Sequence, residues 1–153
     1  MTTPLIFQPT LTCSTAPAYS AGDLVGGKLT IDNSIAGGLA ASRTCFLQAI
    51  GLVDQAKQNV PMHVILFRSD PTGTTFTDNA AFDVADADMS KICGYVAISS
   101  YTQFNDNSYG YTTALGIPVP FSSQLYAAFV AQGAGTYVAT TDLVPSFIFF
   151  DGA

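Results

Sequence analysis

Turn residues interrupt this chain so often that few folds remain open to it. Clusters of Gly, Pro, Asn and Asp recur roughly every 8 to 12 residues, which is the spacing of short antiparallel strands. The intervening stretches are rich in β-branched and aromatic residues, and we count about eight or nine of them. The clearest predicted strands cover residues 42–55 and 62–68, and a short polar turn between them predicts a hairpin. Further strands are predicted at 94–104, 108–115, 124–132 and 144–151.

This spacing of turn residues predicts an all-β fold, a single-domain antiparallel β-sandwich of jelly-roll-like form. The length of 153 residues fits one domain with one core. Pro9 lies in the first apolar stretch, so residues 1–18 are predicted to form an N-terminal arm or edge strand. Residues 19–153 are predicted to form the sandwich itself.

One stretch, TFTDNAAFDVADADMSKICG at residues 75–94, departs from the strand pattern because three aspartates crowd into six residues. An EF-hand calcium loop needs Gly at its sixth position, but counting from Asp83 that position is Asp88. The apolar residues Phe82, Ala85 and Met89 instead follow the spacing of one helical face. We therefore predict a short helix near 83–92, with Asp83, Thr77 or Asp78 as its N-cap. An irregular cation site and a catalytic carboxylate cluster are the alternatives.

The charge content argues against several classes of protein. Only 10% of the residues are charged, against about a quarter in a usual soluble domain, so the surface is either rich in uncharged polar groups or partly covered by partners. The net charge is −6 and the five basic residues lie far apart, which disfavours nucleic-acid binding. Every apolar run is too short to cross a membrane as a helix. The first residues show no signal-peptide pattern, so we expect the chain to be made and kept in a cytoplasm-like compartment.

No catalytic, cofactor-binding or metal-binding residue is predicted. His63 is the only histidine and lies within an apolar strand, so a hydrogen-bonded strand histidine is favoured over a catalytic base. Gly26 and Gly27 are predicted to be turn residues rather than part of a phosphate loop. The cysteines have no CxxC spacing and are predicted to be buried thiols. They are Cys13, Cys45 and Cys93.

Aromatic residues gather around a predicted hairpin with the turn NDNS. Exposed aromatic platforms with Asn or Asp donors are used in sugar binding, so a glycan-binding module is one interpretation of this cluster. Ordinary cross-strand packing is the other. The cluster consists of Tyr95, Tyr101, Phe104, Tyr109 and Tyr111.

Three stretches of the chain together resemble a family of small structural proteins of tailed bacteriophages. They are AYSAGDLVGGKLT, LFRSDPTGTTFTDNAAFDVADADMSKICG and LYAAFVAQGAGTYVATTDL, and the resemblance extends over residues 19–143. These proteins look like capsid cement or decoration proteins. The resemblance implies a β-sandwich or jelly-roll subunit, a homotrimer, that binds the outer surface of the major capsid protein. It implies no catalytic residues and no cofactor.

The sequence as a whole therefore predicts a non-enzymatic virion protein that binds and stabilises the major capsid protein lattice. The apolar arm and the following loop are the predicted partner interface, at Leu5, Ile6, Phe7, Asp32, Asn33 and Ile35. A receptor- or glycan-binding module of a phage tail is the first alternative function. A small hydrolase that uses His63 is the second.

Overall fold

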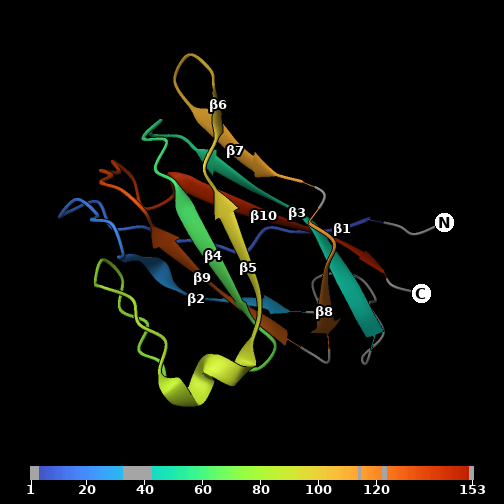
Figure 1. Ribbon diagram of the computed structural model, residues 1–153. Coiled ribbons are helices and arrows are strands. Elements are labelled where there is room, and N and C mark those ends of the chain that lie inside the picture. The colour runs from blue at the N-terminus through green and yellow to red at the C-terminus, as the bar shows by residue number, and fades with distance from the viewer. Residues whose placement is uncertain (1–3, 33–42, 114, 122–123, 152–153) are drawn as a thin grey trace.

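The computed structural model describes residues 4–32, 43–113, 115–121 and 124–151. Within these ranges the chain forms ten β-strands and one short 3-10 helix over Asp86–Lys91 (Figure 1). The strands are β1 (Pro4–Phe7), β2 (Leu24–Asp32), β3 (Arg43–Asp54), β4 (Met62–Phe67), β5 (Ile92–Ile98), β6 (Tyr101–Gln103), β7 (Ser108–Thr112), β8 (Ile117–Phe121), β9 (Gln124–Ala131) and β10 (Leu143–Asp151). No described helix is long and apolar enough to span a membrane.

The strands form two antiparallel sheets with jelly-roll topology. The six-stranded sheet has the order β1-β10-β3-β7-β6, and β8 pairs with the first half of β3. The four-stranded sheet has the order β2-β9-β4-β5. The pairs β1·β10, β2·β9, β3·β8 and β4·β5 are nested one inside the next, as in one long hairpin that has been rolled into two layers. The predicted all-β sandwich of jelly-roll form is therefore confirmed.

The core lies between the two sheets and is built by alternate residues of each strand. Phe147 and Phe149 of β10 point inward, and Phe147 lies edge-on to Phe129 of the opposite sheet, with ring centroids 6.1 Å apart. Phe7 packs edge-on against Phe149 at 5.4 Å. The edge strand β1 therefore contributes a buried ring to the same core as the central strands.

The predicted hairpin between residues 42–55 and 62–68 is wrong, because β3 and β4 belong to different sheets. The connecting turn redirects the chain instead of folding it back. The buried carboxylate of Asp54 accepts hydrogen bonds from the backbone N–H groups of Ala56 (3.1 Å) and Asn59 (2.8 Å). Lys57 and Asn59 both have a positive φ of 53°, and this lets the turn cross from one sheet to the other.

The predicted short helix is confirmed, but its predicted start is wrong. Phe82 and Val84 pack against the sheet at alternate positions, so the chain stays extended until Ala85. The helix then follows as a 3-10 turn whose N-cap, Ala85, makes no side-chain cap bond. Asp78, one predicted cap, instead accepts hydrogen bonds from residues far away in sequence. Gly26 and Gly27 also depart from prediction, since they lie in a bulge inside β2.

Candidate interaction surface

The connection between β4 and β5, residues 68–91, lies over part of the outer face of the four-stranded sheet. We call this connection the strap. Phe76, Phe82 and Val84 of the strap pack against a buried cluster on the outer face of the sheet, formed by Leu24, Phe67 and Ala128. The rings of Phe76 and Phe82 are 5.3 Å apart. The strap therefore covers the part of this face around Leu24, Phe67 and Ala128, whereas Tyr95 of β5 on the same face is 54% exposed.

Lys28 of β2 connects the strap to the four-stranded sheet. It forms a salt bridge with Asp70 of the strap. Its ammonium group also lies 5.8 Å from the ring centroid of Phe76 and 5.4 Å from that of Tyr126, within range of a cation–π interaction. The charge of Lys28 thus lies between a carboxylate and two rings.

The outer face of the six-stranded sheet carries no such cover in the described chain. Strand register places one set of side chains side by side on this face, opposite to the core-facing set. The strands that carry it, β1, β10, β3, β7 and β8, all belong to the six-stranded sheet (Figure 1). We call this set the bare face: Pro4, Ile6, Gln8, Phe46, Ala49, Gly51, Val53, Tyr109, Tyr111, Pro118, Val144, Ser146, Ile148 and Phe150.

None of the residues of the bare face is charged, and most are aliphatic or aromatic. The register forms continuous rows across the sheet, such as Ile6–Ile148–Ala49. Three large apolar side chains stand out into solvent, with exposed fractions of 61% for Ile6, 46% for Tyr111 and 39% for Phe46. Ala49 and Gly51 at the centre of this face are buried, and the exposed apolar side chains around them form the kind of surface that marks an interaction site in a soluble protein.

Two stacked tyrosines make up one side of the bare face. The rings of Tyr109 and Tyr111 lie 5.6 Å apart and within 24° of parallel. Tyr109 extends over Gly51 of β3, so closely that a Cβ on Gly51 would lie 2.0 Å from its hydroxyl oxygen. Gly51 is therefore required for the ring to lie flat against the sheet. Burial raises the pKa of Tyr109, which keeps its hydroxyl neutral.

The predicted partner residues divide between the bare face and other places. Ile6 lies on the bare face, whereas Leu5 is half-buried and Phe7 is buried in the core. Asp32 is half-buried at the end of β2. Asn33 and Ile35 lie outside the described residues. Sequence reasoning named Tyr111 only as part of a possible sugar-binding cluster. It missed Phe46 and Ile148, although the run SFIFF in β10 signals a strand that is apolar on both faces.

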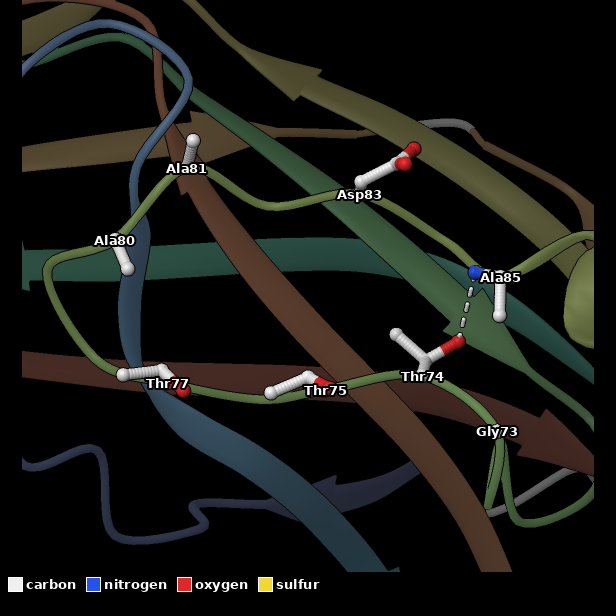
Figure 2. A pocket seen from close by; sticks show the side chains of 8 residues that line it. All are labelled: Gly73, Thr74, Thr75, Thr77, Ala80, Ala81, Asp83 and Ala85. Carbon is white, nitrogen blue, oxygen red and sulfur yellow. Dashed lines mark hydrogen bonds between the residues drawn. The ribbon is translucent and has the colours of Figure 1, made fainter.

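The strap also contains an open hollow of about 440 Å³ (Figure 2). Two stretches of the strap run past each other on either side of it, and the Thr74 hydroxyl accepts a 3.1 Å hydrogen bond from the Ala85 N–H. Its lining consists of Gly73, Thr74, Thr75, Thr77, Ala80, Ala81, Asp83 and Ala85. The small side chains are those that alternate with the phenylalanines facing the sheet, so the hollow follows from how the strap packs.

The aspartates of the strap are used separately rather than as one cluster. Asp88 is buried, accepts a 2.8 Å hydrogen bond from Thr74 and pairs with Lys91 at 2.7 Å. Asp78 binds donors of the β1–β2 connection, and Asp83 is exposed beside the hollow. Among the described residues no three His, Cys or Asp side chains lie together as a metal site.

The structure also places the other residues that the sequence singled out for possible chemistry, His63 and the three cysteines. His63 is half-buried on the outer face of β4, where its ring lies edge-on to Tyr95 at 5.0 Å. The cysteines are thiols, with Cys13 and Cys45 buried and Cys93 half-buried. Burial raises the pKa of Cys93 to about 11.

Tyr101, Phe104, Tyr109 and Tyr111 lie on or beside the β6–β7 hairpin, as predicted, whereas Tyr95 lies on β5. The five rings nevertheless do not share one surface. Tyr109 and Tyr111 lie on the bare face, and Tyr95 lies on the outer face of the other sheet. The hydroxyl of Tyr101 donates a 2.7 Å hydrogen bond to the Val60 carbonyl, and Phe104 is exposed near the β6–β7 turn. These rings therefore do not form a single sugar-binding platform.

Comparison with known proteins adds little to this description. No protein-family model and no curated protein sequence matches the chain. Among solved structures, a chain from Desmodium yellow mottle tymovirus is similar over 99% of this chain and 81% of its own length, with 13% sequence identity and a TM-score of 0.32. A likeness at this TM-score supports no conclusion about function, and the jelly-roll assignment rests on strand order alone.

Proposed function

We propose that the chain is a non-enzymatic structural protein of a virus particle, a cement or decoration protein that binds the major capsid protein lattice and stabilises it. The observation that carries this proposal is the bare face, an uncharged and largely apolar sheet surface. Such a surface favours a protein that works in permanent contact with other subunits. The sequence resemblance to phage decoration proteins supplies the kind of assembly.

The difference between the two sheets supports this role. The strap covers part of the outer face of the four-stranded sheet, whereas within the described ranges Ile6, Phe46 and Tyr111 on the outer face of the six-stranded sheet stay exposed. Burying apolar surface stabilises a protein by about 25 cal/mol for each Å² removed from water. An apolar face that stays in water does not make this contribution. A partner that covers the bare face recovers this free energy, which then contributes to assembly.

The proposed mechanism is mechanical rather than chemical. A jelly roll whose central strands pair on both sides is a rigid body, and its first and last strands β1 and β10 are paired with each other. A rigid subunit that contacts neighbouring shell subunits adds buried area between them. Separating the shell subunits then requires breaking these added contacts as well.

The composition of purified particles tests the proposal. We expect the protein at a fixed ratio to the shell subunit, and we expect particles stripped of it to lose their genome at a lower temperature. Adding the purified protein back should restore the original temperature. Particles that contain no copy of the protein would overturn the proposal.

The stacked ring pair of Tyr109 and Tyr111 favours one second candidate, a glycan-binding module of a phage tail. Tyr111 is 46% exposed, and sugars commonly stack on such rings. A glycan array probed with the purified protein separates the two candidates. Specific binding that is lost in Tyr111→Ala would favour the tail module, and an array without signal would leave the decoration protein.

A further inference from the structure

We infer that the bare face packs against the bare face of a second copy of this chain, so that two jelly rolls form a two-fold dimer. The inference rests on the proposed function only in taking this face to be a protein interface. It assigns a second copy of the chain to this face, whereas the proposed function states only that the face contacts other subunits.

The distribution of exposed apolar residues favours a two-fold pairing. Within the described ranges, Ile6, Phe46 and Tyr111 are the large exposed hydrophobic residues of the bare face. The remaining ones lie apart, on different elements: Met89 in the 3-10 helix, Tyr95 in β5, Phe104 after β6 and Val138 between β9 and β10. The surface that best matches the bare face is therefore the bare face itself. A self-complementary patch gives an isologous, two-fold interface rather than a ring.

The charges of the chain favour the same arrangement. Two chains of net charge −6 repel each other, and the repulsion falls with the distance between their charged groups. The strap, which lies on the opposite sheet, contains five aspartates and two basic residues, Arg68 and Lys91, so it carries a net charge of −3, half of the total of −6. Packing bare face on bare face therefore places the two acidic straps on opposite outer sides of the dimer, with both sandwiches between them.

The size of the face suffices for such a contact. With strands about 4.8 Å apart and a rise of about 3.3 Å per residue, the 4, 9, 12, 5 and 5 residues of β1, β10, β3, β7 and β8 cover roughly 550 Å². Two such faces bury roughly 1,100 Å², close to the lower end of specific protein interfaces. Twisted sheets pack face to face with their strands about 30° apart, so two copies of this sheet have a standard way to meet.

This dimer differs from the trimer that the sequence resemblance implies. A trimer needs a second, different apolar surface that fits the bare face. The exposed hydrophobic residues away from the bare face lie singly, on separate elements, and provide no patch of matching extent in the described chain.

The molar mass of the purified protein in solution, measured by light scattering and by sedimentation equilibrium over a wide concentration range, tests the inference. We expect a dimer for the unaltered chain. Tyr111→Lys places a charge in the interface, and we expect it to weaken dimerisation about tenfold or more. Ile6→Lys provides a second variant on the same face. Tyr95→Lys is the matched control, because Tyr95 is 54% exposed on the other sheet, and it should remain a dimer.

Circular dichroism and the unfolding temperature show whether each variant is folded. A monomer or a trimer for the unaltered chain would overturn the inference, as would equal dissociation by Tyr95→Lys and Tyr111→Lys. Particle binding separates this failure from that of the proposed function. A monomer that binds particles only with Tyr111 intact assigns the bare face to the shell, whereas a dimer absent from particles leaves the inference standing and removes the proposed function.

Discussion

The hydroxyl of Tyr19 donates a 2.7 Å hydrogen bond to the carboxylate of Asp78, 59 positions further along the chain. The Ser14 hydroxyl and the Gly26 N–H donate to the same carboxylate. Burial, and next the hydrogen bond to Asp78, raise the pKa of Tyr19. A single carboxylate thus joins the β1–β2 connection to the strap on the four-stranded sheet.

Replacing this carboxylate should destabilise the protein strongly. Asp78→Ala leaves the Tyr19 hydroxyl and the Gly26 N–H without an acceptor, and both residues are buried. We expect a loss of about 2 to 4 kcal/mol in the free energy of unfolding, measured by urea denaturation. Asp83→Ala is the matched control because Asp83 is exposed in the same strap. Similar losses in the two variants would contradict the assigned role of Asp78.

Protonation of Asp88 should account for part of the loss of stability of this protein at low pH. The hydrogen bond from Lys91 and, to a lesser extent, that from Thr74 hold the pKa of Asp88 below its usual value of 3.8. A carboxyl whose pKa is lower in the folded than in the unfolded state stabilises the fold above the unfolded pKa. This contribution is lost as the pH falls from about 3.8 through the lower, folded value.

Asp88→Asn should remove that part of the pH dependence. We expect urea denaturation of this variant between pH 6 and pH 2 to show a shallower decline than the unaltered protein, from a lower starting stability. Asp86→Asn is the control, because Asp86 is exposed in the same 3-10 helix. Parallel curves for Asp88→Asn and the unaltered protein would show that Asp88 does not contribute to the acid limb.

The strands of this fold were predictable from sequence because their signals are local. Turn residues and β-branched runs lie next to each other in the chain, and the strands around His63 and Tyr109 were predicted close to their observed positions. The predicted hairpin between β3 and β4 was wrong because the signal for it, a polar turn, is also local. A polar turn signals a reversal, but whether the next strand joins the same sheet depends on distant partners such as β9 and β10.

The candidate surface was predictable only in part. Ile6 was identified because an apolar side chain in an edge segment is visible in the sequence. Phe46 was not identified as a surface residue, and Tyr111 was named only as a possible sugar-binding ring, since their exposure depends on which of the two sheets receives the strap. Asp78 was expected as a helix cap because capping preferences depend on neighbouring residues, whereas its partner Tyr19 lies far away in the sequence. The missed features are those set by contacts between distant segments.

Thiol reagents should react slowly with the folded protein. Burial raises the pKa of Cys93 to about 11, so at pH 8 almost all of this half-buried side chain is the unreactive thiol. Burial raises the pKa of Cys13 as well. We expect colorimetric thiol titration at pH 8 to show little reaction until denaturant is added, after which three thiols per chain react. Fast reaction in the folded state that disappears in Cys93→Ser would contradict this assignment.

Close packing at Gly110 should make the end of the sandwich sensitive to one added methyl group. Gly110 of β7 faces the core, and a Cβ there would lie 2.7 Å from both the Ile98 Cγ2 and the Tyr101 Cε1. The Tyr101 ring cannot move away easily, because its hydroxyl donates a hydrogen bond to the Val60 carbonyl. Gly110→Ala should therefore lower the free energy of unfolding by about 1 to 3 kcal/mol, as measured by urea denaturation.

Gly27→Ala is the matched control, since a Cβ at that strand position meets nothing within 4 Å and should change stability little. Equal effects of the two substitutions would show that loss of backbone freedom, rather than the contact with Ile98 and Tyr101, determines the result.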